Sequence, residues 1–174
     1  MTKLLDFLRG DKPNHTLAGV GLTALSYGVA ALGALTMHGK RGRASNAWYH
    51  GLEKPPANPP DKLFGPVWSV LYGTIAYSGW RIWRAPKSEE RSRALALWGT
   101  QLVLNGAWTP LFFGARKPRA ALLDLVALDA AAGTYAEAAA KVDRTAALAV
   151  VPYLAWLGFA TYLNGGIVKH NPRA

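Results

Sequence analysis

Tryptophan is the residue type in this 174-residue chain whose side chain is best suited to chemistry, because the usual catalytic sets are missing. The chain contains no Cys, which excludes disulfides and thiolate metal ligands. No Ser–His–Asp set and no phosphate-binding loop is evident. No metal site is expected, since the four histidines are scattered: His15, His38, His50 and His170. Seven tryptophans remain, and an indole ring can stack on a flat conjugated ligand and can be oxidised.

Aromatic, small and polar residues recur at helical spacing near the end of the chain. Tyr153, Trp156, Ala160, Leu163 and Asn164 fall on one face if this segment is a helix. That face carries rings, a small residue and a polar tip. It is interpreted either as the wall of a pocket, with a gap at Ala160 that admits a flat ligand, or as a packed seam between helices.

Several polar residues occur inside otherwise apolar runs. Asn105 and Trp108 are neighbours at i and i+3, and a buried Asn needs a partner, for which Asp124 is the candidate. For Asn105 and Asp124, two roles remain open: a structural hydrogen bond between helices, or contact with a ligand. Asp129 is expected either to face a wet cavity or to be protonated. Glu137, near the end of its run, is expected to extend toward the membrane surface.

Long apolar runs must position these residues, and each is long enough to cross a bilayer, which takes about 20 residues. Hydropathy alone could reject the fourth run because of its acids, but acids are tolerated when they face a bundle interior. An amphipathic segment at the membrane surface is expected over residues 1–15, and a polar tail over 169–174. The five predicted spans are residues 16–38, 63–83, 94–113, 120–140 and 145–168.

The net charge of +10 is interpreted through the membrane. The basic residues flank the apolar runs, where Lys and Arg meet anionic lipid headgroups. No basic face with base-stacking aromatics is present, so nucleic acid is not an expected partner. The basic residues divide evenly between the two sides of a five-span arrangement, so charge leaves the orientation open.

A proline-rich stretch joins the first two predicted spans, and it is expected to form a stiff, non-helical cover after a basic, flexible start. Its fixed residue types resemble a motif of the translocator protein family (TspO/MBR), also called tryptophan-rich sensory proteins or peripheral-type benzodiazepine receptors. The residues that carry the motif are Trp48, Tyr49, Leu52, Lys54, Pro55, Pro59 and Pro60, followed by Trp68, Leu71 and Tyr72. The stretches 104–116, 121–125 and 151–164 are similar to the family's third, fourth and fifth helices.

This resemblance implies an all-α bundle of five transmembrane helices that binds porphyrins such as protoporphyrin and haem, sterol-like lipids and aromatic drug-like molecules. No cofactor is required, and porphyrin or haem enters as a ligand. A homodimer, with a small-residue face such as Ala96–Thr100, and a bacterial inner membrane are expected. The ligand-lining residues carried over from the family are Ala34, Met37, Phe64, Gly65, Val67, Trp68, Asn105, Trp108, Leu123, Ala127, Trp156, Ala160 and Leu163.

Two further functions stay open. In the first, the protein degrades bound porphyrin in light, with Trp68 and Trp156 as the oxidisable residues, as some bacterial members of the resembled family do. In the second, it is a structural or stress-response membrane protein whose ligand is incidental. The chain also departs from the family motif, because Ala57 stands where the family usually has a loop Trp, and Gly165 replaces the Tyr of a mammalian cholesterol motif.

Overall fold

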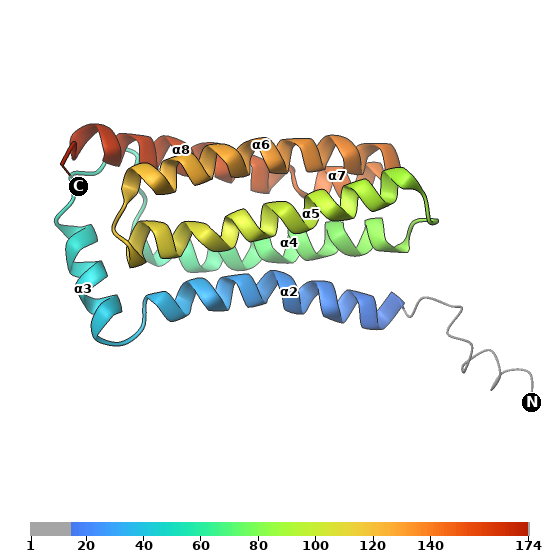
Figure 1. Cartoon of the computed structure of the whole chain (residues 1–174), viewed down its shortest axis with the longest axis horizontal. Helices are drawn as coiled ribbons and strands as arrows, with labels where there is room; N and C mark the ends of the chain where they lie inside the picture. The colour runs from blue at the N-terminus through green and yellow to red at the C-terminus, as the bar shows by residue number, and fades with distance from the viewer. Residues whose placement is uncertain (1–14, 174) are drawn as a thin grey trace, which may run out of the picture.

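The computed structural model describes residues 15–173, which contain helices and no strand. Five long helices lie side by side along the long axis of the molecule, and α3 crosses one end of them (Figure 1). The long helices have 20 to 25 residues, or ~30–38 Å at 1.5 Å per residue, which matches a bilayer. The elements are α2 (His15–Thr36), α3 (Gly39–His50), η1 (Asp61–Leu63), α4 (Phe64–Arg84), α5 (Glu89–Thr109), η2 (Pro110–Gly114), α6 (Pro118–Val142), α7 (Arg144–Ala149) and α8 (Val151–His170).

Apolar side chains occupy both the inside and the outside of the bundle. Inside, Ile75, Leu128 and Leu157 are fully buried where the helices pack together. Outside, Leu25 and Val103 are well exposed on α2 and α5. An apolar outer face in addition to an apolar core is typical of helices surrounded by lipid.

A glycine allows close packing between α4 and α5. Trp98 of α5 lies against Gly79 of α4, and a Cβ on that glycine would fall 2.6 Å from the indole ring. The Trp98 indole N–H donates to the carbonyl of Ile75 at 2.9 Å. Close packing at a small residue and a satisfied indole therefore hold these helices together.

By length and mean hydropathy alone, two segments of the described chain could cross a membrane, His15–Thr36 and Arg144–His170. Helix α6 carries Asp124, Asp129 and Glu137, and these acids lower its hydropathy. The helix nevertheless buries its other face against α5 and α8. Hydropathy therefore underestimates the number of long helices in this bundle.

The expectation of a flexible basic loop after the first span is wrong. Residues Gly39–His50 form helix α3, although their composition is polar. Tertiary contacts explain the helix: Ser45 donates to the carbonyl of Phe113 at 2.8 Å, and Tyr49 is buried against Phe112. The proline-rich segment 51–60 that follows is non-helical, as predicted.

The fifth predicted span is interrupted rather than continuous. Helix α7 ends at Ala149, and α8 begins at Val151 with Pro152 in its first turn. Proline cannot donate the hydrogen bond that would join the two helices, so the break falls just before it. Helix α8 continues to His170, into the predicted polar tail, and the predicted surface segment 1–15 lies almost wholly outside the described residues.

Candidate functional site

Trp68 and Trp156 face each other between α4 and α8. Their ring centroids are 6.5 Å apart and their planes lie at 87°, an edge-to-face contact. Both are half-buried and pack against the main core. The two candidate tryptophans, far apart in the sequence, therefore meet inside the bundle rather than pointing outward.

Further rings extend this pair into an aromatic cluster. Phe64, one turn before Trp68 on α4, meets Trp156 edge-on at 5.9 Å. Tyr72, one turn after, lies 5.5 Å from Trp68, and Tyr153 of α8 lies 6.4 Å from the same ring. The i, i+4 spacing on α4 and the i, i+3 spacing on α8 place these rings on facing stripes. We call Phe64, Trp68, Tyr72, Tyr153 and Trp156 the aromatic cluster.

A chain of hydrogen bonds lies beside the aromatic cluster, and we call the side chains that it joins the polar floor: Tyr72, Asn105, Tyr153 and Gln101. The Tyr72 hydroxyl donates to Asn105 Oδ1, and Asn105 Nδ2 donates to the Tyr153 hydroxyl at 3.1 Å. Tyr153 in turn donates to Gln101 Oε1 at 2.8 Å. All four side chains are buried, and they join α4, α5 and α8. The predicted pairing of Asn105 with Asp124 is wrong, because Asn105 faces α4 and α8 instead.

The acids of α6 have different environments. Asp129 Oδ2 accepts a hydrogen bond of 2.6 Å from Thr161 of α8, an interhelical pair that neither sequence interpretation included. Glu137 is exposed near the end of α6. Asp124 Oδ2 and the indole nitrogen of Trp156 are buried and have no hydrogen-bond partner among the described residues. Buried polar atoms normally find partners, so these two atoms are available to a ligand.

Helix α3 and the proline-rich segment are fastened over the end of the bundle where α8 terminates (Figure 1). Pro55 packs so closely on α8 that a Cβ at Gly166 would lie 2.9 Å from its ring. Asn171 bonds both backbone groups of Glu53, at 3.1 and 2.9 Å. These contacts hold the proline-rich segment against the end of α8, and we call this segment together with α3 the cover.

The motif residues Tyr49 and Lys54 strengthen this cover from within. Lys54 Nζ lies 4.5 Å from the centre of the Tyr49 ring, a cation–π contact. Burial raises the pKa of Tyr49, although its hydrogen bond with Asn58 acts in the opposite direction. Trp48 contacts Phe112 edge-on at 5.6 Å, while Leu52 packs beside them.

The other predicted lining residues divide into two groups. Val67 and Ala160 pack against the core beside the aromatic cluster, and Leu163 is buried on the same helix as Trp156. Trp108 stacks on Phe112 at 4.9 Å and donates to Asn164 of α8 at 3.1 Å. Because Phe112 also contacts Trp48 and Tyr49, Trp108 connects α8 to the cover. The residues that the structure leaves outside these contacts are Ala34, Gly65, Leu123 and Ala127, which are exposed, and Met37, which is half-buried in the turn that follows α2.

Two residues near the site are absent from the sequence-based prediction. Gln101 closes the hydrogen-bond chain, and Phe159 lies 5.6 Å from Trp156. Gln101 is one helical turn before Asn105, and two amides at i and i+4 in an apolar run are a signal that could have identified it. Phe159 is one of many apolar residues in its helix, so the sequence offers no comparable signal for it.

Comparisons with known proteins agree with this architecture. Residues 22–169 match the model of the TspO/MBR family. The chain is 44% identical to the translocator protein of Sus scrofa over 71% of this chain and 75% of that protein. It is 39% identical to the Homo sapiens translocator protein over 80% and 82% of the two chains. It is also 40% identical to the tryptophan-rich protein TspO of Chlorobaculum tepidum, over 72% and 81%. The chain therefore belongs to the TspO/MBR family of multi-pass integral membrane proteins, and its five long helices form that family's transmembrane bundle.

Proposed function

We propose that the protein binds flat hydrophobic molecules, with porphyrins such as protoporphyrin or haem as the main class, between Trp68 and Trp156. The observation that carries this proposal is the edge-to-face meeting of the two indoles at 6.5 Å inside the bundle. Large aromatic walls with few polar groups are typical of sites for such ligands. Sterol-like lipids and aromatic drug-like molecules satisfy the same chemistry.

Binding requires one indole to turn. The two ring planes stand at 87°, so a flat ligand cannot stack on both until they become nearly parallel. The indole N–H of Trp156 has no partner among the described residues, so turning this ring breaks no hydrogen bond there. After the turn, the same N–H is free to donate to an acceptor on the ligand.

The polar floor restricts how deep the ligand goes. Asn105, Tyr153 and Gln101 satisfy one another through hydrogen bonds, so a purely apolar ligand gains nothing by displacing them. The cover over the adjacent end carries Lys54, a cation suited to the carboxylates at the edge of a porphyrin. The ligand's apolar ring then contacts the aromatic cluster, and its acidic edge points toward the cover.

Titration of protoporphyrin into the purified protein in nanodiscs, followed by porphyrin absorbance, tests the proposal. We expect saturable binding that Trp156→Leu weakens roughly three- to tenfold, because an aromatic pair contributes about 0.5–1.5 kcal/mol beyond its buried area. Trp83→Leu is the matched control, since Trp83 lies exposed at the far end of α4. Equal affinity in both variants would contradict the assigned site, and absence of saturation would favour a structural or stress-response role.

We propose light-dependent degradation of the bound porphyrin as a second candidate function, because the two oxidisable indoles contact each other at the site. The protein is illuminated with protoporphyrin beside Trp68→Phe and Trp156→Phe. Bleaching that slows in the variants supports degradation. Equal bleaching in all three samples removes it and leaves binding alone.

The assembly and the membrane are also proposals. We place the protein in a bacterial inner membrane and expect a homodimer through a small-residue face of α5 that includes Ala96 and Thr100. Both residues are exposed, and the Thr100 hydroxyl is already bonded to the Ala96 carbonyl at 3.0 Å, so the face is smooth and carries no free hydroxyl at that position. Light scattering in detergent that yields one chain per particle would contradict the dimer.

A further inference from the structure

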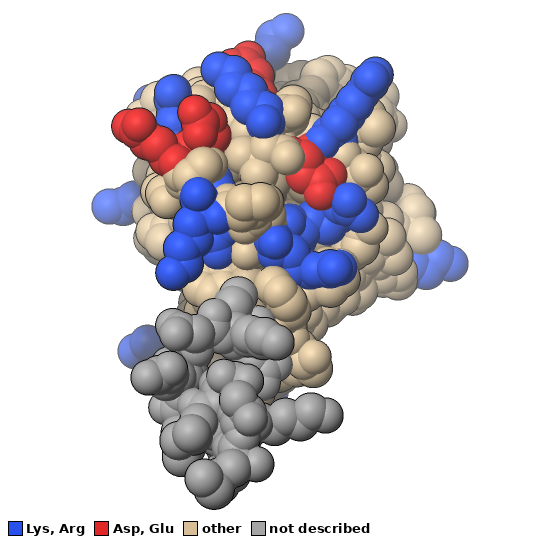
Figure 2. All heavy atoms as spheres, turned by 90° about the vertical axis from the view of Figure 1, so that its right-hand side faces the viewer, with Lys and Arg blue, Asp and Glu red and all other residues tan. Residues whose placement is uncertain are grey.

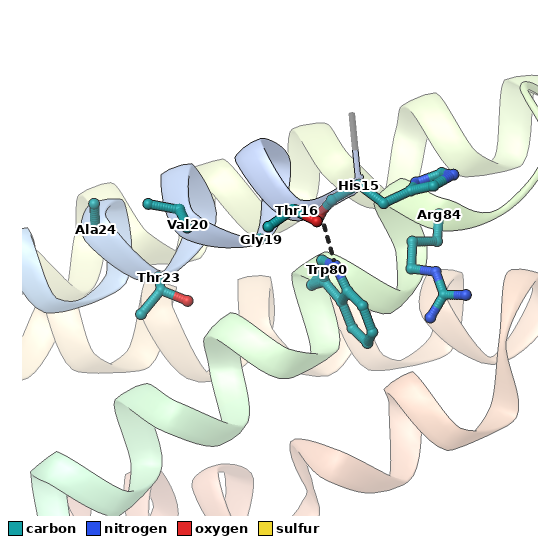
Figure 3. A pocket seen from close by; sticks show the side chains of 8 residues that line it. All are labelled: His15, Thr16, Gly19, Val20, Thr23, Ala24, Trp80 and Arg84. Carbon is teal, nitrogen blue, oxygen red and sulfur yellow. Dashed lines mark hydrogen bonds between the residues drawn. The ribbon is translucent and has the colours of Figure 1, made fainter. Parts of the chain in front are cut away.

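A hollow of about 620 Å³ is lined by residues of α2 and α4. The ends of these two helices that form it are opposite the cover (Figure 1). The walls of the hollow are mostly apolar or small residues of α2, among them Gly19, Val20 and Ala24, and it opens to the outside. Figure 3 shows Trp80 and Arg84 of α4 closing its lower side, with His15 at the start of α2 above Arg84. From His15 to Ala24 the wall extends ~14 Å along α2.

The shape of the hollow depends on one hydrogen bond between the helices. The indole N–H of Trp80 donates to the carbonyl of His15 at 3.1 Å, drawn as the dashed line in Figure 3. Gly19 allows the Trp80 ring to lie against α2, since a Cβ there would be 3.0 Å from it. Trp80 therefore forms a fixed floor, and the apolar groove extends along α2 away from it.

Among the residues that the structure describes, Arg84 is the cation that lines this hollow. Its guanidinium lies over the Trp80 ring at 4.5 Å, which holds the group at the edge of the hollow. Within residues 15–173 it makes no salt bridge and no hydrogen bond to protein, whereas Arg81, one turn earlier, is paired with Asp143 at 2.7 Å. A guanidinium has five donors in a planar fork that fits a phosphate.

The surrounding end of the bundle attracts anions. Figure 2 looks onto this end and shows Lys and Arg side chains gathered over it, with fewer Asp and Glu among them. The basic residues in the helix ends and turns that meet here are Arg81, Arg84, Lys87, Arg91, Arg93, Lys141 and Arg144. Trp80 and Trp83 mark the same level, and tryptophan at a helix end is typical of the boundary between lipid and water.

We propose that this hollow binds one anionic phospholipid, with its phosphate on Arg84 and one acyl chain along the apolar wall of α2. The three parts of the hollow match the three parts of such a lipid. The Arg84 guanidinium faces the lipid phosphate, and the Trp80 indole lies at the level of the glycerol. Val20 and Ala24 form the part of the wall that extends toward the membrane centre and contacts the acyl chain. The site is separate from the aromatic cluster, which lies nearer the other end of α4, and does not depend on the proposed porphyrin binding.

The charge is tested by lipid retention in native mass spectrometry. The delipidated full chain in detergent is mixed with equal amounts of palmitoyl-oleoyl phosphatidylglycerol and phosphatidylcholine. We expect one phosphatidylglycerol to be retained in preference to phosphatidylcholine. Arg84→Gln is expected to lower that retention roughly fivefold, which corresponds to about 1 kcal/mol for one cation near the membrane surface.

Two matched controls separate this site from a general effect of charge. Arg144→Gln removes an exposed cation at the same end, on α7, which does not line the hollow, and is expected to retain the lipid as the unchanged protein does. Ala24→Phe fills the groove without touching the charge and is expected to lower retention. Leu25→Phe puts the same ring on the next exposed position of α2, outside the hollow, and is expected to change nothing.

The outcomes distinguish a lipid from other occupants. Glycerol phosphate at the same concentration must not displace the lipid, because it lacks the acyl chain; displacement would mean a simple phosphate site and overturn the proposal. Equal losses in Arg84→Gln and Arg144→Gln, or in Ala24→Phe and Leu25→Phe, would also overturn it. Circular dichroism of each variant checks the fold, and if Arg84→Gln fails to fold, the Ala24→Phe and Leu25→Phe pair decides the question.

Discussion

Replacement of Tyr153 by Phe is expected to destabilise the bundle without changing its shape. The Tyr153 hydroxyl is buried, accepts a hydrogen bond from Asn105 at 3.1 Å and donates one to Gln101 at 2.8 Å. Phenylalanine keeps the ring and its packing in the aromatic cluster. The substitution therefore removes two interhelical hydrogen bonds and leaves an Asn donor and a Gln acceptor unsatisfied inside the membrane.

The size of the effect follows from these two bonds. Interhelical hydrogen bonds between side chains in membrane proteins contribute about 0.6 kcal/mol on average and at most about 1.7. Two of them predict that Tyr153→Phe lowers the free energy of unfolding by roughly 1–3 kcal/mol. Tyr162→Phe on the same helix is the matched control. Its side chain is 53% exposed on the outer face, so its loss is expected to cost less than about 0.5 kcal/mol.

Reversible unfolding in mixed detergent micelles, followed by far-UV circular dichroism, measures both variants. A second experiment combines Tyr153→Phe with Gln101→Leu, which removes both the Tyr153 hydroxyl and the Gln101 acceptor that the single substitution leaves unsatisfied. If the hydrogen-bond chain is the cause, the two losses are not additive. Equal stabilities for Tyr153→Phe and Tyr162→Phe would refute the reasoning, because the buried chain would then contribute nothing.

Two further predictions concern packing and pH. Gly79→Ala is expected to cost about 1–3 kcal/mol, because its Cβ would lie 2.6 Å from the Trp98 ring, whereas Gly133→Ala, with nothing within 4 Å, is expected to be neutral or slightly stabilising in the same assay. Burial raises the pKa of Asp143, but hydrogen bonds from Arg81 and the α7 backbone outweigh burial, so its pKa lies below the usual value. Its stabilisation is present above the unfolded pKa of about 3.9 and is lost as pH falls through the lower native pKa. Asp143→Asn is expected to flatten this dependence in melting curves across acid pH, and an unchanged curve would contradict the role of the pair.

The number and approximate position of the long helices could be predicted from the sequence, because apolar runs of sufficient length are a local property. Even α6, with three acids, was predicted, with help from the family resemblance. Helix α3 could not be predicted, since its own composition is polar and its stability comes from Tyr49 and Ser45 packing on η2. Contacts of that kind are set by the distant residues Phe112 and Phe113, which no local pattern connects to α3.

The candidate site shows the same division. The shared face of Tyr153, Trp156 and Ala160 followed from helical spacing, while the meeting of Trp68 with Trp156 was implied only by the resemblance. The partner of Asn105 was predicted wrongly because several helices carry polar residues, and the rotation of each helix about its axis decides which of them meet. In the structure Asn105 is turned toward Tyr72 and Tyr153 rather than toward Asp124.

The central claim is that a flat ligand lies between the indoles of Trp68 and Trp156. A structure of the protein with protoporphyrin bound tests it most directly. We expect the macrocycle in van der Waals contact with both indoles, with the Trp156 ring turned from its present perpendicular position. A macrocycle on the outer, lipid-facing surface, with the two indoles still in their 6.5 Å edge-to-face contact, would contradict it.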